Sequence, residues 1–228
     1  MPSPAIGILE TKPQAVVFDW DNTLVDTWPI IHAALEATFV AMEQPPWTLE
    51  QTKQRVAKSL RDSFPDLFGD RWEDAATVFY DTFGALHLER LQPIKQAEDL
   101  LRTIAGAGLP CSIVSNKQGA FLRDEIAHLG WGGHIHAGIG ATDAERDKPD
   151  PAPMHLALSG TGLTPSRRIW YVGDSPIDMK FAAATGCRGI LVHDAPVLSP
   201  ETRENTDVVL SDLPELIEVF NALPPGNR

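Results

Sequence analysis

The chain has 228 residues, of which 43% are hydrophobic and 22% are charged. This length fits one large domain or a core domain with a smaller insertion, and the composition is ordinary for a folded globular protein. An excess of 31 acidic over 19 basic side chains gives a net charge of −12, which argues against binding to a nucleic-acid polymer or to an anionic membrane surface.

Short apolar runs of the kind that form buried strands recur along the chain. The first is the run Ala15-Val16-Val17-Phe18, which is rich in β-branched and aromatic residues and too short for a typical helix. Because later runs show no alternation with polar residues, we expect strands that are buried on both faces. These later runs cover residues 111–114, 135–139, 169–172 and 189–192, with a shorter one at 207–210.

Helical patterns separate these predicted strands. A capping-box pattern at Asp212 and Glu215 opens a last helix that runs to Leu223. Strands that alternate with helices predict an α/β fold, with a parallel sheet and helices on both of its faces. The other helices of this part are predicted at residues 96–107, 121–129, 151–158 and 177–185.

Residues 28–91 interrupt the alternation, because they contain helical patterns and no convincing buried strand. Thr48 and Gln51 form a second capping box, and residues 72–91 can form a further helix. We therefore predict a core of residues 1–27 and 92–228 that carries an all-helical insertion of residues 28–91. The first helix of the insertion is indicated by apolar residues at helical spacing: Ile31, Leu35, Phe39 and Met42.

Polar side chains follow several of the predicted strands at the point where each strand ends. Asp19 and Asp21 come after the first strand, Ser115 after residues 111–114, and Asp174 after residues 169–172. Lys148 lies beyond the third strand. Ligands of open parallel sheets bind at the carboxyl ends of the strands, so we expect these five residues to meet in one crevice.

The residue types in this crevice suit phosphoryl transfer. Clustered carboxylates repel one another unless a hard divalent cation lies among them, and oxygen ligands favour Mg²⁺. With its charge screened, Asp19 can attack a phosphate and form an aspartyl-phosphate, which splits one hard hydrolysis into two displacements. Asp21 is placed to protonate the leaving alkoxide and later to deprotonate water.

The remaining polar groups are expected to bind phosphate or metal. Ser115, Lys148 and the backbone around Asn116 can donate to phosphate oxygens. Asp174 is a candidate metal ligand. Asp178, four residues further on, is a candidate ligand or a residue that holds metal-bound water and Lys148 in place.

Four segments of the chain together resemble the motifs of the haloacid dehalogenase superfamily. They are Asp-Trp-Asp-Asn-Thr, Val-Ser-Asn, Lys-Pro-Asp-Pro and Gly-Asp-Ser-Pro-Ile-Asp, in this order along nearly the whole chain. The helical insertion is similar to the small cap of the phosphoglycolate-phosphatase-like branch. The resemblance implies a Rossmann-like core with a mobile helical cap, and a Mg²⁺ ion held by Asp19, the main-chain carbonyl of Asp21 and Asp174. Dehalogenases of the superfamily lack the second acid, so Asp21 argues against carbon–halogen cleavage.

The function that we predict is a Mg²⁺-dependent phosphohydrolase acting on a small phosphorylated metabolite. A phosphoglycolate-like monoester is favoured, with nucleotides or sugar phosphates behind it. A phosphomutase or a pyrophosphatase would use the same core, and a catalytically silent binding protein would keep the same fold. A signalling receiver domain combines similar groups, but it has about half this length and no helical insertion.

The sequence of the cap does not identify the substrate or the oligomeric state. Its basic residues Lys53, Arg55, Lys58 and Arg61 share a helical face, which we expect to be mainly solvated; the alternative is that one of them reaches the substrate, without an indication of which one. The tryptophans of the insertion are expected to pack inside it or at its hinge. No apolar run approaches the length of a membrane span and the first residues lack a signal-peptide pattern, so a cytoplasmic location is expected.

Overall fold

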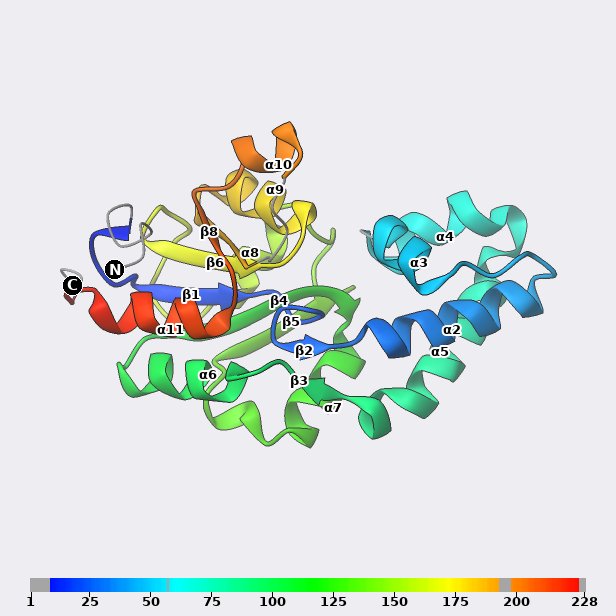
Figure 1. The fold of residues 1–228 in the computed structure, drawn as a ribbon, viewed down its shortest axis with the longest axis horizontal. Helices are drawn as coiled ribbons and strands as arrows, with labels where there is room; N and C mark the ends of the chain where they lie inside the picture. The colour runs from blue at the N-terminus through cyan, green and yellow to red at the C-terminus, as the bar shows by residue number, and fades with distance from the viewer. Residues whose placement is uncertain (1–8, 57, 193–197, 226–228) are drawn as a thin grey trace.

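The structure, a computed structural model, describes residues 9–56, 58–192 and 198–225. Within these residues one sheet contains six strands in the order β5-β4-β1-β6-β7-β8, and all of its pairs are parallel (Figure 1). The predicted α/β fold with a parallel sheet is confirmed. The strands are β1 (Ala15–Phe18), β4 (Cys111–Gln118), β5 (Ala137–Ala141), β6 (Ile169–Gly173), β7 (Arg188–Val192) and β8 (Val208–Leu210).

Helices cover both faces of this sheet, as Figure 1 shows. Alternate residues of β1 enter the two cores: Val16 and Phe18 pack on one side, and Ala15 and Val17 on the other. The first side is covered by α6 (Ala97–Gly106), α7 (Gly119–His128) and α11 (Leu213–Ala222). The second side is covered by α8 (Ala152–Ala157) and α9 (Pro176–Thr185).

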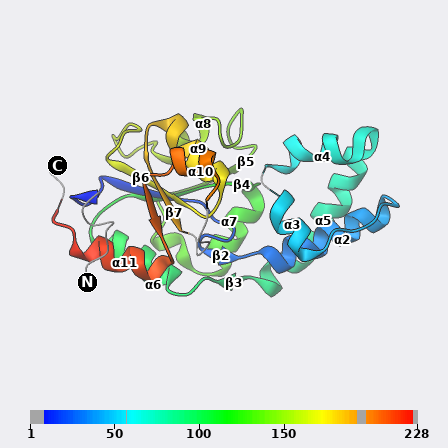
Figure 2. The same cartoon turned by 45° about the horizontal axis from the view of Figure 1, so that its top comes forward.

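The helical insertion lies beyond one end of the sheet, in both views of the ribbon (Figures 1 and 2). Its helices bury a core of their own, in which Phe39 and Phe64 both pack on Phe68. The capping box predicted at Thr48 and Gln51 is present. The elements are α2 (Trp28–Ala41), α3 (Leu49–Arg55), α4 (Leu60–Phe68), the 3₁₀ turn η1 (Gly69–Arg71) and α5 (Trp72–Arg90).

Two chain segments connect the insertion to the core, and they pair with each other. They form a small antiparallel ribbon of β2 (Val25–Asp26) and β3 (Gln92–Pro93). Beside it, Ile30 and Phe83 of the insertion pack against Phe121 of α7. The ribbon lies at the predicted domain boundaries, 27/28 and 91/92, which stay a prediction.

Some elements differ from the sequence-based expectation. The strand predicted at residues 135–139 begins at Ala137, because Ile135 packs on the core from a loop. The strand predicted at residues 111–114 continues to Gln118, with an irregular register after Val114, so Ser115 and Asn116 lie within β4. The short helix α10 (Pro200–Glu204) was not predicted, because its polar sequence has no apolar periodicity. No helix in the described ranges has both the length and the apolarity for a membrane crossing.

Candidate active site

The carboxyl ends of the central strands bring the predicted site residues together. Asp19 directly follows β1, and its amide donates to Val172 of β6 over 2.8 Å, which fixes the start of the loop. Asp174 directly follows β6, and Ser115 lies in the irregular part of β4. These three residues line one cavity together with Asp21, Asn116 and Lys148. The sequence-predicted convergence is therefore present in the structure.

Three carboxylates form the centre of the site. One oxygen from each of Asp19, Asp174 and Asp178 lies within 4.8 Å of the others. Thr23 donates to Asp174 over 3.2 Å. Gly173 makes room for this cluster, because a Cβ atom at this position would come within 2.3 Å of the Asp178 carboxyl carbon.

Lys148 is the cation that faces the three carboxylates. Its ammonium nitrogen Nζ donates to Asp19 Oδ1 over 2.7 Å, to Asp178 Oδ1 over 2.8 Å and to the Tyr171 hydroxyl over 2.9 Å. The side chain of Asn116 holds the Lys148 backbone from both sides: its Oδ1 accepts from the Lys148 amide and its Nδ2 donates to the Lys148 carbonyl. All three ammonium protons of Lys148 are therefore engaged, and its position is fixed.

Burial and mutual repulsion shift the protonation of this cluster. Burial is the largest cause that raises the pKa of Asp19, to about 7, against the opposing charge of Lys148. Burial, followed by the charges of Asp178 and Asp19, also raises the pKa of Asp174 well above its usual value. For Lys148, burial alone would lower the pKa, but the charges of Asp178 and Asp19 raise it. The pocket holds more negative charge than one lysine balances.

The donor set fits a hard divalent cation. It consists of carboxylate oxygens only, from two strand ends and the first turn of α9, and their repulsion adds to burial in raising the pKa values of Asp19 and Asp174. Mg²⁺ prefers such oxygen ligands. A cation bound there would relieve the repulsion that a single ammonium leaves.

Behind Asp21 lies a buried group of charges that sequence reasoning missed. Nζ of Lys117 lies 2.6 Å from Asp21 Oδ1 and 2.6 Å from Glu125 Oε2. Glu125, which is fully buried in α7, also accepts from the indole of Trp20 and contacts His87 Nδ1 over 3.0 Å. Burial would lower the pKa of Lys117, but the charges of Asp21 and Glu125 raise it.

One signal in the sequence bears on these missed residues. Lys117 directly follows the Val-Ser-Asn segment, so its position next to a predicted site residue was a usable signal. Glu125 and Tyr171 gave none, because the first occupies an ordinary helical position and the second lies inside an apolar strand run. The side chain of Trp20 belongs to the buried core on the α7 side of the sheet, where it packs edge-on against Trp131.

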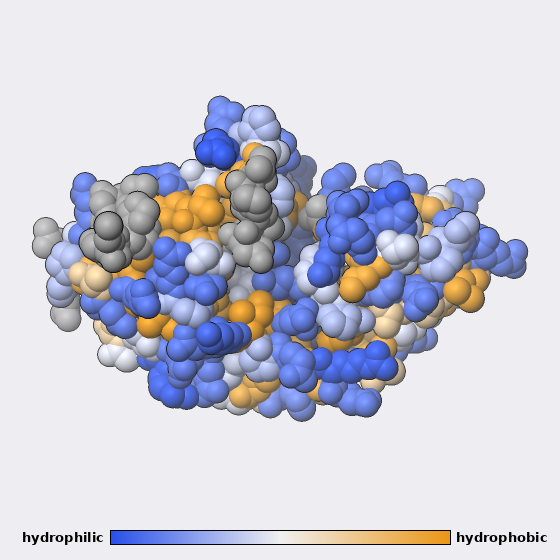
Figure 3. Space-filling view, in the orientation of Figure 1, coloured by the Kyte–Doolittle hydropathy of each residue, from blue (hydrophilic) through white to orange (hydrophobic). Residues whose placement is uncertain are grey.

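The candidate site opens into a cavity of about 1020 Å³ between the core and the helical insertion. The surface is hollowed between these two parts of the molecule (Figure 3). Lys53, Arg55 and Lys58 line this cavity, and Arg61 pairs with Asp147 of the core. Lys53, Arg55 and Lys58 are exposed to solvent, as expected for this basic face, and they line the cavity at the same time, whereas Arg61 is partly buried by its pair with Asp147.

The chain resembles known hydrolase sequences over most of its length. The sequence profile of the haloacid dehalogenase-like hydrolases matches residues 16–192. A phosphoglycolate phosphatase of Pectobacterium atrosepticum is 30% identical over 189 residues, which cover 79% of this chain and 80% of that protein. An N-acetylmuramic acid 6-phosphate phosphatase of Pseudomonas aeruginosa is 28% identical over 216 residues, covering 91% and 95%.

Solved structures share the fold. A haloacid dehalogenase-like hydrolase from Bacteroides fragilis superposes with a TM-score of 0.81 at 22% identity, covering 90% of this chain and all of that one. A protein from Haemophilus somnus that is described as a predicted phosphoglycolate phosphatase superposes with a TM-score of 0.76 at 19% identity. The match covers 92% of this chain and 98% of that one. At these identities the likeness concerns the arrangement of the sheet and helices, and it confirms the fold that the motifs imply.

Proposed function

The chain belongs to the haloacid dehalogenase-like hydrolases, and we propose that it hydrolyses phosphomonoesters of small metabolites with Asp19 as the nucleophile and Mg²⁺ as the cofactor. Its enzyme class is that of its relatives, the phosphoric monoester hydrolases. The observation that carries the proposal is the position of Asp19. Its carboxylate lies at the end of the central strand β1, within reach of two further carboxylates and 2.7 Å from the Lys148 ammonium.

Mg²⁺ would be held by Asp19, by Asp174 and by the main-chain carbonyl of Asp21. Asp178 would contribute from its place beside Lys148, either as a further ligand or by holding metal-bound water. When bound, the ion supplies positive charge that lets an anionic phosphate approach an anionic nucleophile. The same positive charge would balance the negative charge of the carboxylate cluster, which Lys148 alone does not balance.

In the first step, a carboxylate oxygen of Asp19 forms a bond to phosphorus while the ester P–O bond breaks. Asp21 gives its proton to the leaving alkoxide. The hydroxyl of Ser115 and the amide of Asn116 donate to the phosphate oxygens. The products of this step are the free alcohol and an aspartyl-phosphate.

In the second step, Asp21, now a carboxylate, takes a proton from a water molecule that attacks the phosphorus of the aspartyl-phosphate. The bond from phosphorus to Asp19 breaks, which releases inorganic phosphate and restores the Asp19 carboxylate. Lys117 lies 2.6 Å from Asp21 Oδ1 and so can hold this carboxyl group in place in both steps.

Lys148 can remain paired with a negative group in both steps without moving. In the free enzyme its ammonium group donates to Asp19. Once Asp19 is phosphorylated, its carboxylate charge is lost and the phosphate oxygens become the nearest acceptors. Asp178 and Tyr171 keep the remaining two ammonium protons, so the lysine does not have to leave its position.

The relatives suggest two substrates of one chemical kind. Phosphoglycolate and N-acetylmuramic acid 6-phosphate, the compounds in the names of two relatives, are both phosphate monoesters that carry a carboxylate. By the names of its relatives alone, a phosphoglycolate-like ester comes first, with sugar phosphates and nucleotides behind it. A mutase or a pyrophosphatase would use the same core residues. The cytoplasmic location stays a prediction.

The test is a phosphate-release assay over a panel of phosphorylated metabolites, with and without Mg²⁺. The panel includes phosphoglycolate, N-acetylmuramic acid 6-phosphate, nucleoside monophosphates and pyrophosphate, and the control is Asp19→Asn. We expect Mg²⁺-dependent release that the variant lacks. Undiminished activity in Asp19→Asn would rule out this nucleophile, and ³¹P NMR of a hexose monophosphate would reveal a mutase by a change of phosphate position.

A further inference from the structure

The cavity above Asp19 has a composition that is unusual for this chain. The whole molecule carries a net charge of −12. We call the helical insertion of residues 28–91 the cap. In contrast to the whole chain, the described cap residues that line the cavity include one acid, Asp66, and three cations: Lys53, Arg55 and Lys58. No described acid pairs with these three cations in the structure, so a positive wall faces the site from α3 and the segment after it.

Most of the other cap residues that line the cavity are apolar or aromatic. Trp28, Trp47, Phe64, Phe79 and Tyr80 line the cavity. Several of these rings are held by other rings: Trp47 packs on Phe39 at 4.7 Å and Phe64 packs on Phe79 at 5.6 Å between centroids. Aromatic surfaces that are fixed in this way can bind an apolar or ring-shaped group at little cost in conformational entropy.

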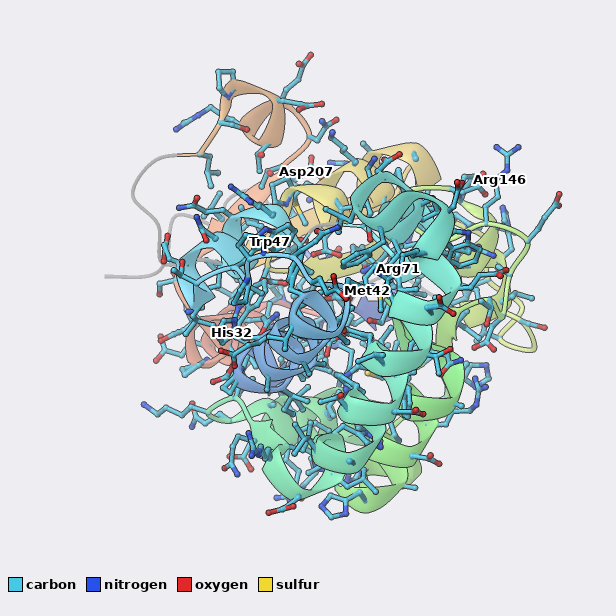
Figure 4. All side chains as sticks on the ribbon, turned by 90° about the vertical axis from the view of Figure 1, so that its right-hand side faces the viewer. His32, Met42, Trp47, Arg71, Arg146 and Asp207 are labelled. Carbon is cyan, nitrogen blue, oxygen red and sulfur yellow. The ribbon has the colours of Figure 1, made fainter. Side chains whose placement is uncertain are left out.

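Arg55 lies where the cationic part of the cavity wall meets the aromatic part. Its guanidinium carbon lies 5.0 Å from the centroid of Trp47, over the face of the ring, and both residues line the cavity. Stacking restrains the guanidinium without using its N–H donors, so they stay available for a planar anion. Figure 4, viewed from the cap side, shows that Trp47 and Arg71 come from different parts of the cap, which makes Arg71 a useful comparison.

The size of the cavity matters as well. Drug-sized ligands occupy pockets of roughly 300–1,000 Å³, and this cavity of about 1020 Å³ is as large as the largest of them. It extends from Asp19 and Lys148 in the core to Arg55 in the cap. A two-carbon acid bound by its phosphate at Asp19 would fill only a small part of this space.

We propose that the substrate is a phosphomonoester whose esterified group has an apolar, ring-sized body and a second anionic group, and that Arg55 binds this second anion. The inference rests on the proposed function, because it describes the remainder of the molecule whose phosphate Asp19 attacks. The aromatic wall packs against the body, and the cationic wall selects the charge. Substrate choice then depends on residues of the cap that take no part in the chemistry.

The experiment separates size from charge with four primary alkyl phosphates: ethyl phosphate, phosphoglycolate, benzyl phosphate and 4-carboxybenzyl phosphate. Each is hydrolysed with Mg²⁺ by the wild type, by Arg55→Gln and by the control Arg71→Gln, an exposed cap arginine outside the cavity. We expect the highest kcat/KM for 4-carboxybenzyl phosphate. Its advantage over benzyl phosphate should be about tenfold, the effect of one charge-assisted hydrogen-bond pair, and Arg55→Gln alone should remove it.

Two results would overturn the inference. One is equal kcat/KM for all four esters, and the other is an equal loss for all four in Arg55→Gln. Binding of the same esters to the Asp19→Asn protein, measured by calorimetry, separates this inference from the proposed function. If Asp19→Asn binds 4-carboxybenzyl phosphate selectively but the wild type hydrolyses none of the esters, the ligand preference of the cap stands and the phosphatase activity is rejected. If the wild type hydrolyses the esters without selectivity, the phosphatase activity stands and the inference is rejected.

Discussion

The guanidinium Nε of Arg61 lies 2.6 Å from Oδ2 of Asp147, which connects α4 of the cap to the segment just before Lys148. Asp147 is almost fully buried, and its Oδ1 accepts from the amide of Thr142. About a third of the Arg61 side chain is exposed (35%), so solvent weakens the pair. The contact holds the cap against the core at the side of the active site.

Arg61→Ala should loosen this contact. We expect a loss of about 1–2 kcal/mol in unfolding free energy, since the buried Asp147 loses one partner. Hydrogen exchange should become faster in residues 60–68, and kcat/KM should fall several-fold. A double-mutant cycle with Asp147→Ala provides the control, because a coupling energy near zero between the two changes would show that the ion pair does not hold the cap.

Tyr171→Phe should reduce activity through Lys148. The Tyr171 hydroxyl accepts from the Lys148 ammonium, so the change removes one of its three acceptors. We expect the protein to lose about 1–2 kcal/mol of stability and kcat to fall several-fold with little change in KM. Trp170→Phe, which alters the neighbouring residue on the other face of β6, should lower stability while kcat stays at the wild-type level. Equal effects of the two variants on kcat would contradict a role for the hydroxyl.

Tyr171 also illustrates what the sequence could and could not predict. The strands were found because parallel strands buried on both faces leave continuous apolar runs. The site was found because Asp19 and Asp174 are polar residues placed directly after such runs. A tyrosine inside the run between residues 169 and 172 looks like a core residue, and only the fold places its hydroxyl beside Lys148.

Boundaries and long-range polar contacts were predicted less well. Ile135 extends an apolar run into a loop, where it packs on the core without joining β5. Glu125 lies at a helix position that pattern alone assigns to the surface, yet its partners Lys117 and His87 come from β4 and α5. Periodicity reports which face is apolar, and it carries no information about which distant charge a buried acid meets.

Glu125→Gln tests the buried group behind Asp21. The variant leaves Lys117 with Asp21 as its remaining carboxylate partner, and removal of one member of a buried ion pair typically costs about 3–5 kcal/mol. We expect a destabilisation at the lower end of this range, read from urea unfolding. In the double variant Lys117→Met with Glu125→Gln, much of the stability should return but activity should fall below that of the wild type, because Asp21 has lost its positioning lysine. A double variant with wild-type activity would exclude a role for Lys117 in catalysis.

The raised pKa of Asp19 predicts how pH affects the metal-free protein. Between its usual pKa of 3.8 and the folded-state pKa of about 7, Asp19 binds more protons in the folded than in the unfolded state. Stability therefore decreases as the pH rises through this window, and the raised pKa of Asp174 acts in the same direction. In EDTA, the Tm of the wild type should fall from pH 5 to pH 8 more than the Tm of Asp19→Asn.

Mg²⁺ should reverse this trend. The cation binds the carboxylate forms and competes with protons, so the increase in Tm that it causes should be larger at pH 8 than at pH 5. The measurement is thermal unfolding at both pH values, with EDTA or with excess Mg²⁺, in the wild type and in Asp19→Asn. The variant should show a much smaller Mg²⁺ effect at pH 8, because it lacks one of the proposed ligands. If the Mg²⁺-induced shift in Tm is the same at both pH values, the ion does not bind at Asp19 and Asp174, and the metal site has to be sought elsewhere in the chain.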